Sequence, residues 1–270
     1  MSAILLLKAC GLQSRLESRC TRMDRWMGKV AVITGASAGI GAAIARSLVK
    51  QGLKVIGLAR DMNQLKLLAE ELKGKPGKFY PLQCDMSLQN EIEGALEWIE
   101  KNLGAVDILI NNAAISLDWS TITGGIEDLK KTLDINVIGL MSITKGILQL
   151  MKNKGLDNGA IVNINDICSL KSLPLATDRP ISPAYASSKT ALTTLTESLR
   201  LELAQNESNI KIINISLGLV ETDLTQQWLK ENPRLALKPK NVADAILFSL
   251  QTPENVLIKD LIITPIREII

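Results

Sequence analysis

A tyrosine and a lysine are the first residues whose spacing suggests chemistry. Tyr185 and Lys189 stand four residues apart, so in a helix they lie on one face, a turn from each other. An ammonium group near a phenol stabilises the phenolate and lowers the tyrosine pKa from its ordinary value of ~10. Tyr185 is therefore a candidate acid/base that moves a proton to or from an oxygen. Alone, this pattern is common on exposed helix faces, so it becomes informative only if a cofactor site meets it.

A glycine-rich turn supplies such a candidate site. Residues 29–34 (KVAVIT) predict a short strand, and residues 40–51 predict a helix that Gly52 ends. Between them stand Gly35, Gly39 and Gly41. A strand, a glycine turn and a helix in this order bring backbone N–H groups against a pyrophosphate at the helix N-terminus. The glycine spacing is one residue longer than the ordinary dinucleotide fingerprint, but the strand and helix around it are the required context.

Arg60 predicts which dinucleotide binds. It follows residues 54–59 (KVIGLA), a second expected strand, whose end meets the adenosine ribose in a dinucleotide-binding fold. An acidic residue there would bind a free 2′-hydroxyl, whereas a guanidinium would pair with a 2′-phosphate. Arg60 therefore favours NADP over NAD. The alternative is a solvated arginine, and Asp61 directly after it weighs against a simple assignment.

Strands and helices alternate along the rest of the chain. We expect further strands at 79–84, 106–110, 161–164, 210–217 and 257–264, and helices at 92–103, 127–151 and 242–250. Asn136, near the middle of 127–151, is a poor helix former and is either an inward-facing polar group or incidental. The alternation predicts an α/β fold, a doubly wound parallel sheet of the Rossmann type with helices on both faces in three layers.

Composition excludes several classes of protein. The 270 residues, 46% of them apolar, suit one large α/β domain, and a net charge of +3 gives no reason to expect nucleic-acid binding. Without histidine the chain has no Ser-His or Cys-His pair and no histidine metal site. Four scattered cysteines indicate neither zinc nor a disulfide framework, so we expect no metal and a cytoplasmic location. No stretch reads as a transmembrane span.

The first 22 residues differ from the rest. Their five-residue apolar run, 3–7, is too short for a signal-peptide core. The basic residues after it resemble a weak mitochondrial presequence, although Glu17 and Asp24 interrupt that pattern. The other interpretation is an extended start upstream of Met23. We favour this second interpretation and expect residues 1–22 to be a disordered extension before a single domain at 23–270.

Together these pieces resemble the short-chain dehydrogenase/reductase family from about Met23 to the C-terminus. The matching pieces are residues 34–41 (TGASAGIG), Asp85, Asn111-Asn112-Ala113, Asn136 and Tyr185-x-x-x-Lys189. Within the family, residues 23–41, 51–60 and 190–203 are most similar to the farnesol dehydrogenase-like branch, which also includes ketosteroid reductases. The resemblance implies dimers or tetramers.

The resemblance also implies how NADP would be held. The glycine turn would cradle the diphosphate, Arg60 would hold the 2′-phosphate, and other residues would contact the adenine, the ribose and the carboxamide end. The implied residues are Gly35, Ser37, Gly39, Ile40 and Gly41 for the diphosphate, Asp85 and Met86 for the adenine, Asn112 and Ala113 for the ribose, and Gly218, Val220 and Thr222 for the carboxamide.

For catalysis, the resemblance implies that Tyr185 exchanges a proton with the substrate oxygen while hydride moves at the nicotinamide. Lys189 would hold the nicotinamide ribose and lower the tyrosine pKa, and Asn136 would position a water of the proton relay. Leu217 stands where a proline usually precedes Gly218, which is expected to loosen the loop over the nicotinamide. Ala114 replaces a glycine at little expected cost.

Asp166 is the main departure from the family pattern. A serine that donates to the substrate oxygen normally stands two residues after the last apolar position of the fifth strand, and counting from Ile164 this position is Asp166. Ser169 is a minor alternative and Ser172 is another serine in the following loop, which is expected to be lengthened and to contain Pro174, Pro180 and Pro183. An ionised carboxylate has no proton to donate. At ~4 Å and an effective dielectric of ~20 it would oppose the phenolate by ~4 kcal/mol. A protonated Asp166 in a dry site would instead donate as serine does.

The leading hypothesis is therefore an NADP(H)-dependent oxidoreductase that interconverts an alcohol and a carbonyl on a lipophilic small molecule, such as a terpenoid alcohol or a ketosteroid. The alternative is an impaired or silent NADPH-binding member of the family, because of Asp166. Residues 221–237 are expected to cover the pocket. Trp228 and Leu229 are either apolar walls of that pocket or ordinary core contacts.

Overall fold

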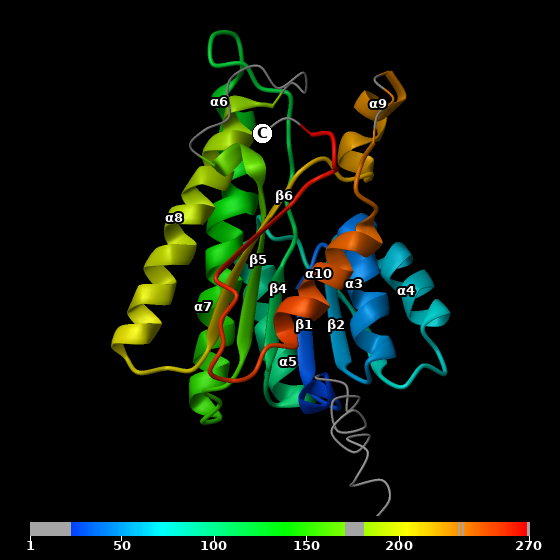
Figure 1. The fold of residues 1–270 in the computed structure, drawn as a ribbon, viewed down its shortest axis with the longest axis vertical. Helices are drawn as coiled ribbons and strands as arrows, with labels where there is room; N and C mark the ends of the chain where they lie inside the picture. The colour runs from blue at the N-terminus through cyan, green and yellow to red at the C-terminus, as the bar shows by residue number, and fades with distance from the viewer. Residues whose placement is uncertain (1–22, 171–180, 232, 234, 269–270) are drawn as a thin grey trace, which may run out of the picture.

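Seven strands of the described residues form one parallel sheet in the order β3-β2-β1-β4-β5-β6-β7 (Figure 1). In the computed structural model, the described residues are 23–170, 181–231, 233 and 235–268. The strands are β1 Val30–Thr34, β2 Lys54–Ala59, β3 Lys78–Gln83, β4 Ile108–Asn111, β5 Ala160–Asp166, β6 Lys211–Leu217 and β7 Asp260–Ile263. The order reverses between β1 and β4, where an open parallel sheet forms a crevice at the carboxyl ends of its strands.

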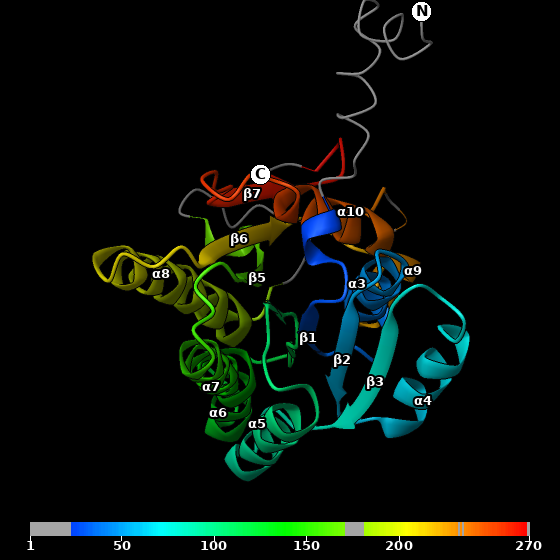
Figure 2. The same ribbon diagram turned by 90° about the horizontal axis from the view of Figure 1, so that it is seen from below.

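Helices cover both faces of the sheet, as Figure 2 shows from below. The helices α3 and α10 pack together on one face beside α4, and α5, α7 and α8 lie on the other face. Their bounds are α3 Gly39–Lys50, α4 Met62–Glu71, α5 Gln89–Leu103, α7 Leu140–Asn153, α8 Pro183–Gln205 and α10 Pro239–Leu250. Every residue of β1, β4, β5 and β6 is buried, as expected of a parallel sheet covered on both sides. The predicted three-layer fold is confirmed.

The long helix expected at 127–151 is present but changes its winding. It consists of α6 Ile126–Leu133, the π-helical segment η2 Asp134–Gly139 that contains Asn136, and α7. Among the described helices this one is long and apolar enough to cross a membrane by length and composition alone. In this fold Ile143, Ile147 and Met151 are buried in the core beside the sheet.

Two expected boundaries near the site were wrong. The fifth strand does not end at Ile164, because Asn165 and Asp166 continue the pairing with Ser216 and Leu217 of β6. Apolar periodicity could not show this, since buried polar side chains with partners occupy the end of the strand. Pro183 was expected in the preceding loop but begins α8, where its missing N–H costs nothing. Pro174, Pro180, Ser172 and the expected extension 1–22 lie outside the described residues.

Shorter elements complete the description. They are the single-turn helices η1 Asp24–Trp26 and η3 Ile167–Ser169, and the helix α9 Asp223–Glu231, which lies over the carboxyl ends of the strands (Figure 1). The strands at 106–110 and 257–264 were predicted in the right places but are shorter, at β4 and β7.

Candidate active site

Two adjoining cavities open along the carboxyl ends of the strands. The smaller, about 310 Å³, contains Tyr185, Lys189 and Asp166. The larger, about 720 Å³, contains Arg60 and Asp85. They share wall residues, which are Ala38, Asn112, Ala114, Asp223 and Leu224. Except for Gly41 and Asn136, the residues predicted to hold a dinucleotide and those predicted to move a proton therefore line one continuous cleft.

The glycine turn has the shape that a diphosphate needs. Gly35 and Gly39 have φ of +68° and +52°, values that L side chains rarely adopt. At Gly41 an added Cβ would lie 2.2 Å from the carbonyl oxygen of Gly35. The helix α3 starts after Ala38 with no side-chain cap, so the N–H groups of its first turn are left for a ligand. An uncapped helix N-terminus behind a glycine turn suits a phosphate anion.

Asn112 ties this turn to the neighbouring strand. Its side-chain amide donates to the carbonyl oxygens of Thr34 and Gly35, at 2.9 and 3.1 Å. In return, the Thr34 hydroxyl accepts the N–H groups of Asn112 and Ala113, both at 3.0 Å. Thr34 was not among the predicted site residues. A polar residue that ends an apolar strand directly before the glycine was the available signal.

At the adenosine end, Arg60, Asp61, Asp85 and Met86 line the larger cavity. Asp61 caps α4, because its Oδ1 accepts the N–H of Gln64 at 3.1 Å. Burial opposes the charge of Asp85, but hydrogen bonds from Ser87 and the positive charge of Arg60 outweigh it, so the pKa of this carboxyl lies below its usual value. The carboxylate of Asp61 thus caps a helix. Arg60 lies in the wall of the larger cavity, where a 2′-phosphate is expected.

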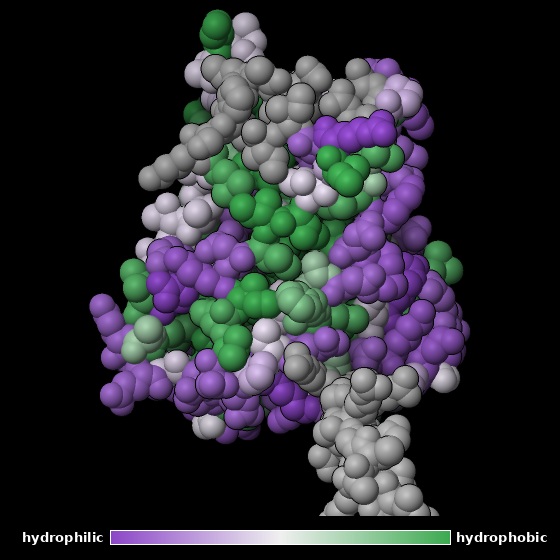
Figure 3. All heavy atoms as spheres, viewed as in Figure 1, coloured by the Kyte–Doolittle hydropathy of each residue, from purple (hydrophilic) through white to green (hydrophobic). Residues whose placement is uncertain are grey.

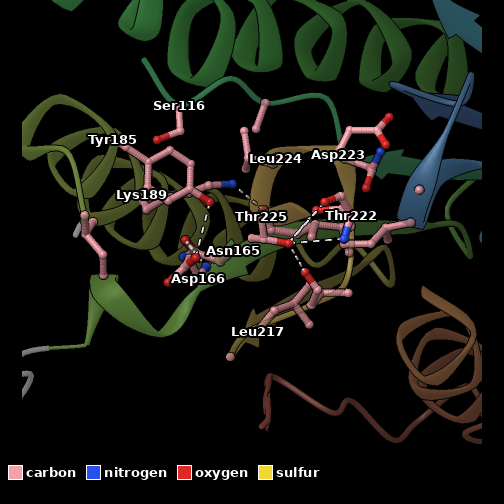
Figure 4. A pocket seen from close by; sticks show the side chains of 18 of the residues that line it. Ser116, Asn165, Asp166, Tyr185, Lys189, Leu217, Thr222, Asp223, Leu224 and Thr225 are labelled. Atoms are coloured by element: carbon pink, nitrogen blue, oxygen red, sulfur yellow. Dashed lines mark hydrogen bonds between the residues drawn. The ribbon is translucent and has the colours of Figure 1, made fainter. Parts of the chain in front are cut away.

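Tyr185, Asp166 and Lys189 gather at the other end of the cleft (Figure 4). The Tyr185 hydroxyl donates to Asp166 Oδ2 at 3.3 Å, and the N–H of Cys168 donates to Asp166 Oδ1 at 2.8 Å. Lys189 donates to the carbonyl oxygen of Ile164 at 2.8 Å, and its Nζ lies 5.6 Å from the centre of the Tyr185 ring. The three side chains are buried, so their charges act on one another with little screening.

The charge of Lys189 depends on its neighbours. Burial lowers the pKa of this amine, while the negative charge of Asp166 and, to a smaller extent, the thiol of Cys168 oppose that shift. The aspartate therefore helps to keep a buried cation beside the tyrosine. The same carboxylate accepts the hydrogen bond of the phenol, so Asp166 acts on both members of the predicted pair.

Asn136 holds two other elements together. Its Oδ1 accepts the N–H of Ile115, and its Nδ2 donates to the Ile115 carbonyl oxygen and to the Ser188 hydroxyl, at distances of 2.9 to 3.0 Å. Ser188 in turn donates to the carbonyl oxygen of Tyr185 at 2.7 Å. Asn136 is thus an inward-facing polar group, and its role in holding a relay water stays a prediction. Ser188 was missed, although a small polar residue between Tyr185 and Lys189 was a usable signal.

The alternative donor Ser169 points elsewhere. Its hydroxyl is buried and donates to the main-chain oxygen of Asp166 at 2.7 Å, whereas the side chain of Asp166 reaches the tyrosine. Of these two side chains, only that of Asp166 therefore contacts the tyrosine hydroxyl. Of the two proposed wall residues, Trp228 lines the smaller cavity and Leu229 is not part of its lining.

The loop after β6 contains the residues that are predicted to contact the carboxamide. Gly218, Val220 and Thr222 all line the smaller cavity. The N–H of Val220, a residue only 4% exposed, has no acceptor among the described residues. A buried amide without a partner suits the carboxamide of a nicotinamide. Leu217 pairs with Ile263 at the end of β6, so the loop begins only after it.

The described residues contain no group of three side chains that could hold a metal ion. Among the hydrogen-bond donors that line the cleft are the Arg60 guanidinium and the buried Lys189 ammonium. Such donors suit an anionic organic cofactor.

Comparison with known proteins identifies the class. A family model for short chain dehydrogenase matches residues 29–233. A farnesol dehydrogenase of Aedes aegypti is 39% identical over 249 residues, which cover 91% of this chain and 99% of that protein. Human dehydrogenase/reductase SDR family member 11 is 37% identical over 258 residues, covering 92% and 98%. The chain therefore belongs to the short-chain dehydrogenase/reductase family, and it resembles the branch of these two relatives.

Solved structures agree with this assignment. An actinorhodin polyketide ketoreductase with NADPH has a TM-score of 0.76 at 26% identity, covering 88% of this chain and 96% of its own. An alcohol dehydrogenase of Thermococcus sibiricus, complexed with 5-hydroxy-NADP, has a TM-score of 0.76 at 25% identity, covering 89% and 97%. The chain is thus a dehydrogenase/reductase of this family.

Proposed function

We propose that the protein is an NADP(H)-dependent oxidoreductase that interconverts an alcohol and a carbonyl on a lipophilic small molecule. The observation that carries this proposal is the continuity of the cleft. The uncapped helix N-terminus at Gly39 and the buried Tyr185 and Lys189 face connected cavities, so one extended dinucleotide can reach both. When bound, NADPH would supply the hydride for reduction and NADP would accept it in oxidation. The side chains of the protein would donate or accept the proton.

In this proposal Tyr185 is the group that gives the proton to the carbonyl oxygen or takes it from the alcohol. Lys189 stabilises negative charge on the phenol oxygen and holds the nicotinamide ribose. Asp166 takes the place of a serine beside the substrate oxygen, where it needs its own proton to donate. The network from Asn136 through Ser188 holds the helix that carries Tyr185.

Arg60 supports NADP over NAD. It lines the adenosine cavity at the end of β2, and the acidic side chain next to it caps α4. The test is binding of NADPH and NADH to the Arg60→Ala variant. Loss of a charged pair with the 2′-phosphate should raise the Kd for NADPH by ~10-fold to 100-fold and leave that for NADH nearly unchanged. Lys66→Ala, an exposed cation on α4, is the matched control. Equal affinity of the wild type for the two cofactors would refute the preference.

A lipophilic substrate is supported by the walls of the smaller cavity. Ile181, Leu217, Leu224 and Trp228 face it, around the few polar groups near Tyr185. One relative is named a farnesol dehydrogenase, so terpenoid alcohols are the first candidates, followed by ketosteroid-like compounds. Turnover should be measured with NADP(H) on a panel of both classes and of simple carbonyls. Tight NADPH binding without turnover on this panel would refute an active enzyme.

An impaired NADPH-binding protein is the second candidate. The bond from the Tyr185 hydroxyl to Asp166 favours it, because a phenol that donates to a carboxylate is not donating to a substrate. Asp166→Ser separates the two candidates. A large gain in rate identifies an impaired site, and a loss identifies Asp166 as a working acid.

The remaining proposals concern assembly and location. Exposed apolar side chains, among them Phe248 of α10 and Ile262 of the edge strand β7, support a homodimer or homotetramer. In Figure 3 apolar residues gather in a band across this face of the molecule. Sedimentation velocity tests the assembly.

Imaging the full chain beside a variant that starts at Met23 tests the proposed cytoplasmic location and the alternative of a targeting segment.

A further inference from the structure

The last described turn of the chain lies against the loop that follows β6. The N–H of Gly218 donates to the Ile263 carbonyl oxygen of β7 at 2.8 Å. The chain then turns at Pro265, whose carbonyl oxygen accepts the N–H of Glu268 at 3.0 Å. This turn brings the Glu268 carboxylate to the N–H of Leu219, at 3.0 and 2.9 Å from its two oxygens.

Gly218 shows how closely the carboxylate sits. An added Cβ at Gly218 would lie 1.8 Å from Glu268 Oε2, although the φ of this glycine is open to other residues. A larger residue at 218 would therefore have to displace the Glu268 carboxylate from this place. A charge-assisted hydrogen bond onto a backbone N–H at this distance is among the stronger restraints available to a loop.

The backbone groups of 218–222 divide into two sets. Gly218, Val220 and Thr222 line the smaller cavity, whereas Leu219 does not. On the far side, Glu268 holds the Leu219 N–H and Leu237 holds the Leu219 carbonyl oxygen. The N–H groups of the stretch all have acceptors among the described residues except that of Val220.

We propose that Glu268 is a positioning residue for the nicotinamide end of the site. By holding the Leu219 N–H from behind the loop, it fixes the neighbouring Val220 N–H for the carboxamide of the cofactor. A proline at 217, as the family usually has, would restrict the backbone directly before the loop. Leu217 does not restrict the backbone in this way. Glu268 instead restrains the loop from the turn at 265–268. This inference rests on the proposed function.

The test compares NADPH with adenosine 2′,5′-bisphosphate, which has the adenosine half and lacks the nicotinamide. In Glu268→Ala the Kd for NADPH should rise by about 10-fold, while that for the bisphosphate stays within about twofold. Glu268→Gln retains an acceptor oxygen and should stay within about threefold for both. Arg267→Ala, exposed in the same turn, is the matched control and should change neither. Calorimetry gives all of these constants.

The outcomes separate this inference from the proposed function. Failure of the wild type to bind NADPH overturns both. Wild-type binding that Glu268→Ala leaves unchanged, or weakens equally for both ligands, overturns the role of Glu268 alone. Hydrogen exchange on the wild type gives an answer even if the variant does not fold. In the cofactor-free protein the Leu219 amide should exchange at least about 10-fold more slowly than the Val220 amide, and NADPH should slow Val220. Equal exchange of the two amides would overturn the inference.

Discussion

The adenosine half of the cleft and the proton-transfer half are built from different groups. At the glycine turn the ligand would contact backbone N–H groups, because the glycines have no side chains that could block its approach. At the other half, Asp166, Tyr185 and Lys189 are buried side chains that act on one another. Backbone groups cannot be exchanged by substitution, whereas a side chain can. The first half therefore takes its shape from the backbone, while the properties of the second depend on single side chains such as that of Asp166.

The difference also separates the expected effects of substitution. Changes in the adenosine half should weaken cofactor binding or stability, since that half only holds the ligand. Changes in the proton-transfer half should alter turnover at nearly constant cofactor affinity.

Tyr185→Phe should produce the largest loss. Removing the hydroxyl removes the proton donor, so kcat should fall by ~10³-fold while the Kd for NADPH changes by less than ~3-fold. Steady-state kinetics and calorimetry give the two numbers. The only other tyrosine, Tyr80, packs edge-on against Trp98 away from the cleft, and Tyr80→Phe is the matched control. A comparable loss in the control, or a large change in Kd, would break the division between the two halves.

Asp166→Ser should decide between the two proposed functions. It removes the carboxylate that accepts the Tyr185 hydroxyl, and it places a donor hydroxyl in this position. An impaired site predicts that the rate of carbonyl reduction at pH 7 rises by ~10-fold or more, since an opposing charge near the phenol is worth up to ~4 kcal/mol. Asp166→Asn, which keeps the size and removes the charge, should give part of this gain. A loss of rate in both variants would show that Asp166 is a working acid.

The sequence was most informative where function depends on the backbone. Glycines at 35, 39 and 41 between a strand and a helix predict the turn, because two of them have positive φ and the third has no room for a Cβ. The order of strands and helices predicts the sheet, since parallel strands covered on both faces form continuous apolar runs. The end of β5 was missed because Asn163, Asn165 and Asp166 interrupt that signal and are buried through side-chain partners.

Side-chain networks were less accessible to prediction. Tyr185 and Lys189 could be paired from their spacing, but the bonds of Asn136 to Ile115 and Ser188 join segments far apart in sequence. Glu268 is the extreme case, because it meets Leu219 only through the pairing of β6 with β7 and the turn after it. The π-helical winding at residues 134–139 also could not be predicted, because the only local indication in the sequence is that Asn136 is a poor helix former.

Cys84 lies in the wall of the larger cavity, and its thiol should make the free energy of unfolding depend on pH. Burial first, then the negative charges of Glu91 and Asp85, raise the pKa of this thiol to about 12. An unfolded thiol has a pKa of ~8.5, so above that pH the unfolded chain loses a proton that the folded chain keeps, and stability falls as pH rises. Between pH 8.5 and 10 this should cost ~2 kcal/mol.

Cys84→Ala should remove that part of the alkaline loss. Urea unfolding of the wild type and the variant at pH 7.5 and pH 10 measures it as a difference of differences, so any cavity left by the substitution cancels. NADPH affinity at pH 7.5 should change little, because the thiol is a wall and supplies no charge. Identical pH dependence in the two proteins would contradict the prediction.

Asp61→Ala should have the smallest effect, and it bears most directly on cofactor choice. An aspartate beside Arg60 could either bind a ribose 2′-hydroxyl, as NAD requires, or serve the fold. The structure assigns it to the fold, because its Oδ1 accepts the N–H of Gln64 and caps α4. Loss of a cap costs ~1 kcal/mol of unfolding free energy, and Asp61→Asn should recover most of it because asparagine also caps.

The Kd for NADPH should stay within ~3-fold in both variants, since neither removes a ligand contact. A selective loss of NADH affinity in Asp61→Ala would instead show that Asp61 reads the ribose, and Arg60 would then no longer distinguish the two cofactors.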